Sequence, residues 1–189
     1  MDRGRRAEEL VGRLVQLGAA RLVPVRFERA SAEARGAGEG RRTRLERIAL
    51  EALKQSGRAW PLEIGQEQGL EGLLTGAAGA AGAVGSAEAE RLVLDPAAPL
   101  RLSAWLAARR ARSPCAWTRA APLCVVVGPE GGLTAEEGAR LGASGATPVA
   151  LGPYVLRIET AAEAAVAVLA EALHRVPQND IRSRSETQA

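Results

Sequence analysis

Two glycine-containing segments hold the residue types best suited to binding a ligand or doing chemistry. The first, Gly128-Pro-Glu-Gly-Gly132, follows an apolar run and precedes a helix start. Because glycine has no side chain, such a turn lets a ligand approach the backbone and offers free N–H groups as donors. The turn lacks the GxGxxG order of a dinucleotide fold and the GK[ST] ending of a P-loop, and Glu130 would repel phosphates. It favours a neutral or cationic ligand.

The second segment, Leu151-Gly-Pro-Tyr-Val-Leu-Arg-Ile-Glu159, repeats the Gly-Pro pair and places Arg157 and Glu159 where the chain enters a helix. An arginine can stabilise a developing anion, and a carboxylate can accept a proton. The same residues are also typical of a salt bridge or cap at a helix N-terminus, where an acidic residue is favourable. The residue types leave both interpretations open.

The elements that must position these loops alternate between strand and helix. Apolar spacings of three and four predict helices, and short β-branched runs predict strands. Thr134, with Glu137 three residues later, forms a capping-box pattern that places a helix start directly after the first loop. The predicted helices are 7–17, 44–56, 100–110, 134–141 and 160–173, and the predicted strands are 21–27, 91–95, 123–127 and 148–151. This order predicts an α/β fold with a largely parallel sheet and a ligand site at the strand ends.

Length and composition indicate one folded domain. The chain has 189 residues, of which 47% are hydrophobic and 25% charged. We expect a domain over residues 1–177, a polar tail over 178–189 and a flexible Gly/Ala-rich surface segment over about 65–90. No apolar run approaches the roughly eighteen residues of a membrane span, and the charged start disfavours a secretion signal. Cys115 and Cys124 are too few for a disulfide framework or a zinc site, so we expect a cytoplasmic protein without a metal.

The basic residues are concentrated at the front of the chain. Residues 1–58 contain 14 Lys and Arg against 8 Asp and Glu, although the whole chain has a net charge of only +3. This asymmetry indicates a polyanionic partner such as RNA, because neutralising phosphates supplies much of the affinity for nucleic acid. A solvated helix face is the alternative interpretation.

Both glycine segments resemble signatures of the RsmE-type family of SPOUT methyltransferases. The similarity is to the family's GPEGG loop and to its LG-x-x-(I/V)-LR-x-ET(A/T) loop. Upstream, Gln16-Leu-Gly-Ala19 resembles the family's ELG(V/A), Phe27-Glu-Arg29 its (S/T)ER-like run, and Leu50-Glu-Ala-Leu-Lys-Gln-Ser-Gly-Arg58 its ALEAxxQSGR helix end. The resemblance covers residues 5–62 and 120–173. The family uses S-adenosylmethionine to methylate N3 of a uridine in small-subunit (16S) ribosomal RNA.

This resemblance implies a SPOUT-type mostly parallel sheet flanked by helices, with a C-terminal trefoil knot, in a homodimer. It implies ribosomal RNA of the small subunit as partner, with Arg29 and Arg58 facing the RNA and Arg157, Glu159 and Arg29 as candidate catalytic residues. The cofactor-binding residues that it implies are Gly128, Glu130, Gly131, Gly132, Leu151, Gly152, Leu156 and Arg157.

The chain also departs from the family pattern. Family members ordinarily carry a PUA-like β-barrel ahead of the methyltransferase domain, whereas this sequence starts almost directly at the first helix of the latter. Gln16 replaces the family's glutamate. These departures leave open a short paralogue with another RNA target, a truncated gene start, a protein with weakened activity, and a non-catalytic RNA-binding or ribosome-assembly module that retains the fold. A generic nucleotide-binding α/β protein is disfavoured, because both glycine fingerprints are absent.

Overall fold

The structure is a computed structural model that describes residues 3–30, 39–75, 89–112 and 122–173. In chain order its elements are α1 (Arg3–Gln16), β1 (Arg21–Leu22), β2 (Val25–Arg26), α2 (Glu39–Ser56), β3 (Glu63–Ile64), β4 (Gln68–Gly69), α3 (Leu70–Thr75), β5 (Glu90–Leu94), α4 (Leu102–Arg112), β6 (Leu123–Val127), α5 (Ala135–Ala143), β7 (Thr147–Val149) and α6 (Ile158–Leu173).

Every strand pairing within these described ranges is parallel, which confirms the expected α/β class. A three-stranded sheet has the order β6-β5-β7, and two short pairs join β1 to β3 and β2 to β4. The strand predicted over 21–27 is two short strands, because Pro24 has no N–H to donate at the break between them. The carbonyl of Pro24 still accepts the amide of Gln68 at 3.1 Å. The trefoil knot stays a prediction.

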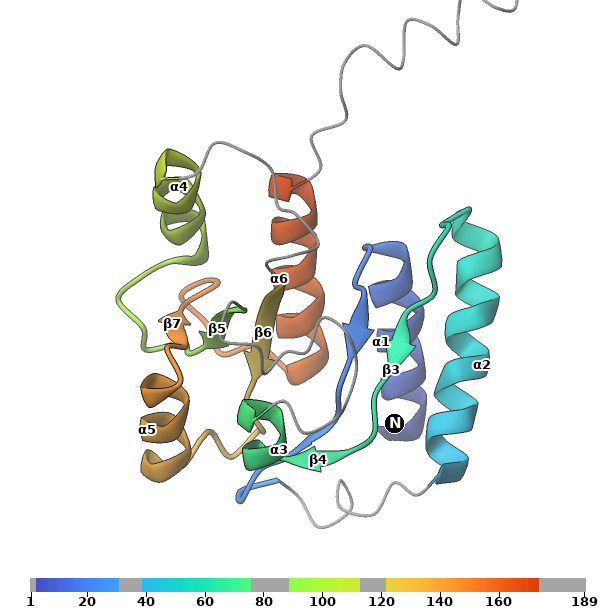
Figure 1. Ribbon diagram of the computed structural model, residues 1–189, viewed down its shortest axis with the longest axis horizontal. Coiled ribbons are helices and arrows are strands. Elements are labelled where there is room, and N and C mark those ends of the chain that lie inside the picture. Colours follow the sequence, from blue (N-terminus) through green and yellow to red (C-terminus); the bar gives the residue numbers. More distant parts are fainter. Residues whose placement is uncertain (1–2, 31–38, 76–88, 113–121, 174–189) are drawn as a thin grey trace, which may run out of the picture.

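The three-stranded sheet is covered by helices on both faces, as Figure 1 shows. Successive side chains of a strand point to opposite faces. Val93 of β5 and Val126 of β6 accordingly join a buried cluster with α3 and α5. Leu92 of β5 joins a second cluster, which α4 and α6 cover. This sandwiched arrangement accounts for the apolar character of the β6 sequence on both faces.

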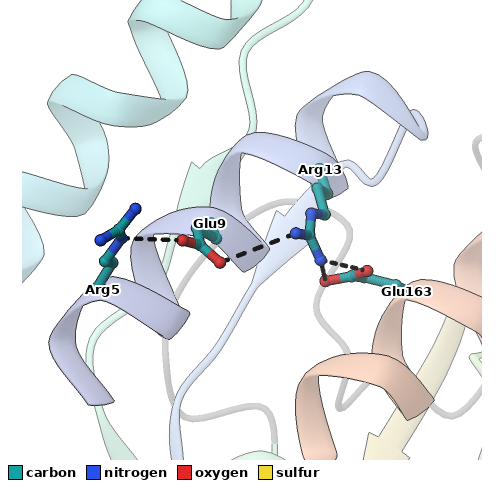
Figure 2. Close-up of polar contacts among 4 residues, drawn as sticks. All are labelled: Arg5, Glu9, Arg13 and Glu163. Atoms are coloured by element: carbon teal, nitrogen blue, oxygen red, sulfur yellow. Dashed lines mark hydrogen bonds and ion pairs between the residues drawn. The ribbon is translucent and has the colours of Figure 1, made fainter. Parts of the chain in front are cut away.

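A second layer is formed by α1 and α2, which lie side by side (Figure 1) and bury a third cluster against β3. Helix α6 contacts both α1 and β6, so it connects this layer to the three-stranded sheet. Figure 2 shows the polar part of that contact, the ion pair between Arg13 of α1 and Glu163 of α6, together with the pairs within α1 that join Arg13 to Glu9 and Glu9 to Arg5. One Arg13 nitrogen lies 2.9 Å from each carboxylate oxygen of Glu163.

Most element bounds differ from the sequence prediction by one or two residues, and the larger differences lie at three places. Helix α1 begins at Arg3, four residues ahead of the predicted start at residue 7. Helix α2 begins at Glu39, ahead of the predicted start at residue 44. The expected flexible segment over 65–90 is wrong at its beginning, because β4 and α3 occupy residues 68–75 and bury Leu70 and Leu73 in the cluster beneath β5 and β6. The part of that segment over 76–88, Cys115 and the tail over 178–189 lie outside the described residues.

Candidate functional site

Both predicted loops leave the same edge of the three-stranded sheet. Because the strands are parallel, their carboxyl ends share one edge, from which Gly128 follows β6 and Ala150 follows β7. β5 lies between these two strands, so the loops start about 10 Å apart, which is two interstrand spacings. Asp95 follows β5 at this edge, and its carboxylate accepts the amide of Ala97 at 2.8 Å, which fixes a local turn. The edge is where ligands bind in open α/β sheets.

The first loop is a tight backbone turn. The amide of Gly132 donates to the carbonyl of Pro129 at 2.8 Å, and Gly132 has φ 72°, a conformation that side chains disfavour. A Cβ on Gly128 would lie 3.3 Å from Cγ of Leu133, which packs against the cluster under α3 and α5. Glu130 is exposed at the tip. The loop therefore presents backbone and one carboxylate to a ligand.

Arg29, predicted to face RNA, lies directly against this loop. Its Nη1 donates to the carbonyls of Gly131 and Leu133, both at the long distance of 3.4 Å. A Cβ on Gly131 would lie 3.0 Å from Cβ of Arg29 and 3.1 Å from its carbonyl oxygen. A side chain at position 131 would therefore crowd the backbone of Arg29 unless one of the two segments shifted. The structure brings a candidate RNA residue and the candidate cofactor loop together.

The second loop is anchored at its beginning and exposed in its middle. Ala150 donates its amide to Leu100 at 2.8 Å and accepts the amide of Leu102 at 2.9 Å, which ties the end of β7 to the start of α4. The half-buried Leu151 packs against the cluster between the sheet and α6. In contrast, Tyr154 is 78% exposed. The half-buried Gly152 and the exposed Leu156, both predicted to bind cofactor, lie in this loop.

Arg157 and Glu159 stand at the amino end of α6. The carbonyl of Arg157 accepts the amide of Ala161 at 2.8 Å, and Glu159 is in the first helical turn. The Arg157 side chain is exposed and that of Glu159 is half-buried. Within the described residues no ion pair joins the two, so the simple salt-bridge interpretation of this motif finds no support there.

Arg58 has a partner within its own chain. Its Nη1 donates to the carbonyl of Val15, in the last turn of α1, at 3.2 Å. Burial lowers the pKa of the Arg58 guanidinium from its ordinary value. A cation is favourable at a helix C-terminus, where carbonyls lack intrahelical partners. The structure thus places Arg58 at the end of α1, with a structural contact that its sequence motif did not indicate.

Glu137 has a larger role than its sequence motif predicted. The capping box is confirmed, because Glu137 accepts the amide of Thr134 at 2.9 Å and donates its own amide to the Thr134 hydroxyl at 3.2 Å. The other carboxylate oxygen of Glu137 also accepts the amide of Glu28 at 2.8 Å. The spacing of Thr134 and Glu137 reveals the cap, but no sequence signal reveals a partner 109 residues away.

Cys124 is an unreactive type of thiol. Burial raises its pKa from 9.0 to about 11, although the nearby Arg91 guanidinium acts in the opposite direction. Among the described residues there is also no group of three or more His, Cys, Asp and Glu side chains that could hold a metal ion. Across those same ranges, no helix is both long and apolar enough to cross a bilayer.

These observations define an α/β protein whose candidate site is built from glycine-containing loops at the carboxyl edge of a parallel sheet. Residues 1–170 match the model of the RNA methyltransferase domain family, and the chain belongs to that family. The resemblance found in the two loop motifs is thereby confirmed. The sequence has no significant match among curated proteins.

Solved structures show the same fold. Ribosomal RNA small subunit methyltransferase E from Neisseria gonorrhoeae, bound to S-adenosylmethionine, has a TM-score of 0.70 and 26% identity over 89% of this chain and 62% of its own. A candidate methyltransferase from Legionella pneumophila, in complex with S-adenosylmethionine, has a TM-score of 0.66 and 27% identity over 88% of this chain and 61% of its own. A probable rRNA methyltransferase from Porphyromonas gingivalis has a TM-score of 0.68 and 23% identity over 92% of this chain and 64% of its own. At this identity it supports the fold alone. The chain thus spans under two thirds of each of these proteins.

Proposed function

We propose that the protein transfers a methyl group from S-adenosylmethionine to N3 of a uridine in small-subunit ribosomal RNA. The observation that carries this proposal is the joint position of the two family loops at one carboxyl edge of the sheet, with Arg29 against the first of them. The family match and the neighbours that bind S-adenosylmethionine support the same activity. We place this activity in the cytoplasm, on the small ribosomal subunit.

The residues present fit an adenosylmethionine site. Gly132 has open space where a side chain would lie, so a ligand can approach the backbone of the turn there, whereas Arg29 fills the corresponding space beside Gly131. Glu130 would complement a cationic ligand and can accept hydrogen bonds from hydroxyl or amino groups. From the second loop, Leu151, Gly152 and Leu156 would supply apolar and backbone contacts. The group itself supplies an electrophilic methyl carbon on a positively charged sulfur.

The chemistry requires loss of the N3 proton of uracil and an in-line approach of the resulting nitrogen to the methyl carbon. Among the candidate residues, Glu159 is a carboxylate that can take the proton. Arg157 or Arg29 can stabilise negative charge on the uracil ring, because a guanidinium stays protonated throughout. A cysteine nucleophile is not needed for attack by N3, which agrees with the raised pKa of Cys124.

Binding and transfer test this proposal separately. Calorimetry with S-adenosylhomocysteine should show binding at micromolar concentrations, and the protein should add methyluridine, detected by mass spectrometry, to small subunits from cells that lack the gene. Failure to bind the ligand at high micromolar concentration would overturn the enzymatic assignment. RNA binding without transfer would instead show a non-catalytic RNA module, and methylation of another nucleotide would show a different target.

Two arginine variants divide the site between cofactor and RNA. Arg157→Ala should weaken adenosylhomocysteine binding, because Arg157 lies where the second loop, the other half of the proposed cofactor site, joins α6. Arg29→Ala should lower RNA affinity and reduce the salt slope by about one phosphate contact. Since both Arg29 contacts to the first loop are as long as 3.4 Å, their loss should change cofactor affinity little. Loss of both ligands in each folded variant would contradict this division.

We further propose a homodimer whose interface includes the second loop. Tyr154 and Val155, which are adjacent, are 78% and 84% exposed, so both side chains are available to pack against a partner chain. The Ala- and Val-rich sequence of α6 is by itself weaker support, because Ala165 and Leu169 pack on the sheet and Val166 packs towards α1 and α2. Light scattering at tens of micromolar should give twice the chain mass, and a monomer there would refute the proposal.

A further inference from the structure

The Glu137 carboxylate connects two chain segments that the proposed reaction assigns to different ligands. One oxygen accepts the amide of Glu28, beside Arg29, at 2.8 Å. The other oxygen accepts the amide of Thr134, at the end of the first glycine loop, at 2.9 Å. Glu137 is only 8% exposed. A buried carboxylate that accepts two backbone amides is strongly oriented, because charge-assisted hydrogen bonds are short and directional.

A helix cap alone does not account for this arrangement. Half of the capping box, the bond from the Glu137 amide to the Thr134 hydroxyl, does not involve the carboxylate. The bond to Glu28 adds nothing to the α5 terminus, because residue 28 follows β2 and lies outside that helix. It does satisfy the amide of Glu28 and hold its segment at the amino end of α5. The carboxylate is therefore shared between a cap and a tertiary link.

The rest of the contact makes the linked segments fit closely. Phe27, on one side of the link, belongs to a buried cluster, and the half-buried Leu133, on the other side, packs against that cluster. The Ala30 amide donates to the Phe27 carbonyl at 3.2 Å, which closes a turn over residues 27–30. At the other end of this turn, Arg29 approaches Gly131 so closely that a Cβ there would lie 3.0 Å from its own Cβ. Glu137 thus holds the turn that carries Arg29 against the glycine loop.

We propose that Glu137 is a positioning residue for methyl transfer, which acts by holding the turn over residues 27–30, and with it Arg29, at the cofactor loop. This inference rests on the proposed function for its effect on catalysis. Its structural half, the link between the two segments, stands independently. Glu137 touches neither substrate nor cofactor in this account, and its influence on the reaction passes through Arg29.

Three variants separate the link from the cap. Glu137→Gln keeps the shape but leaves one acceptor oxygen for two amide donors, so one bond must be lost. Thr134→Ala removes the hydroxyl half of the cap and leaves both carboxylate bonds intact. Glu136→Gln removes an exposed charge from the same helical turn as a matched control. Only Glu137→Gln should speed amide hydrogen exchange in residues 27–30, by about tenfold, the factor expected from one hydrogen bond to a charged group.

Methyl transfer then tests the functional half. Glu137→Gln should lower kcat/KM for RNA by about tenfold, while Thr134→Ala and Glu136→Gln stay within about threefold of wild type. In an Arg29→Ala background the Glu137→Gln effect should vanish, because two changes on one path are not additive. Additive effects, or equal losses from Thr134→Ala, would show a purely structural cap and overturn the inference. An inactive wild-type protein would refute the proposed function instead. Because a glutamine at position 137 can turn its single oxygen to either amide, the link itself is tested by Glu137→Ala, which removes both acceptors; unchanged exchange over 27–30 in that variant would refute the link whether or not transfer occurs.

Discussion

Substitution of Gly131 by alanine should separate the Arg29 turn from the glycine loop. The added Cβ would lie 3.0 Å from Cβ of Arg29 and 3.1 Å from its carbonyl oxygen. Neither atom is the end of a flexible side chain, so the backbone on one side must move. Gly131 does not have a positive φ, unlike Gly132, so the cost of the substitution is steric and not conformational. The variant therefore tests the contact itself.

The size of the effect follows from the tightness of the contact. Overpacking a close-fitting site costs about 1–3 kcal/mol. For a chain of this length, each kcal/mol shifts the melting temperature by roughly 2–4 °C, so we expect Tm to fall by about 2–12 °C in thermal unfolding. Methyl transfer should fall as well, because Arg29 moves away from the loop. Adenosylhomocysteine binding measured by calorimetry should also weaken, because the added methyl group displaces the first glycine loop itself.

Gly138→Ala is the matched control in the helix that follows. Gly138 is exposed in α5, and a Cβ there would meet no atom within 4 Å. Replacing a helical glycine by alanine should raise stability by about 0.5–1 kcal/mol and leave transfer unchanged. If Gly131→Ala were as stable and active as wild type, the close approach of Arg29 to the glycine loop would be wrong.

Three further variants test other contacts. Arg58→Ala should lower the free energy of unfolding by about 1 kcal/mol, because the hydrogen bond to Val15 is lost. A gel-shift assay should also show a lower affinity for RNA. If only the stability falls, the role of Arg58 is purely structural. Glu163→Gln should cost less than about 1 kcal/mol, because Arg13 is 54% exposed, and the difference in Tm should vanish in 1 M salt, whereas a large, salt-independent loss would indicate a buried pair. Cys124, in a chain whose other cysteine is serine, should resist alkylation at pH 8 until the protein unfolds. Because burial raises the pKa of the folded Cys124 thiol from 9.0 to about 11, its contribution to stability should be present below pH 9 and be lost as the pH rises towards 11. In Cys124→Ser this fall in stability with pH should be absent. Rapid alkylation of the folded chain would contradict the burial of the thiol.

The sequence predicts those parts of the fold that carry a strong local signal. The bounds of β6 agree with the prediction because Leu123 to Val127 is an uninterrupted apolar run that ends at Gly128. The α5 start agrees because a capping box marks it. By contrast, α3 has only six residues, and β3 and β4 have two each, so neither helical nor strand periodicity can develop in them. Long-range packing of Leu70 and Leu73 decides that segment.

The candidate site likewise has a part that the sequence predicts and a part that it does not. The two loops are contiguous motifs, so their residues could be named from the sequence, and the parallel sheet then brings them to one edge. The approach of Arg29 to Gly131 spans 102 residues and follows from packing of β2, α3 and β6 around a common cluster. The motif around Arg58 indicated a contact with RNA, but a short motif cannot reveal a partner such as Val15 at the end of another helix. The sequence therefore indicates which residue types can do chemistry, but it does not indicate which distant residues those side chains contact in the fold.

The contacts of Arg29 suggest how one residue can serve both loop and substrate. Its backbone is held firmly, since Glu28 next to it donates to the buried Glu137 at 2.8 Å and Gly131 lies against its Cβ. Its guanidinium is held weakly, because only two contacts of 3.4 Å tie it to the loop and the side chain is exposed. A charged group on a fixed backbone loses little entropy when it turns to a phosphate or a uracil anion, since the search is confined to a few side-chain rotamers. Because Arg29→Lys retains the anchored backbone but not the planar fork, it should bind RNA nearly as well as wild type in a salt titration and still transfer methyl groups more slowly. Equal loss of RNA binding in the lysine and alanine variants would show that Arg29 recognises the RNA by its guanidinium geometry, and that the fixed backbone is not sufficient.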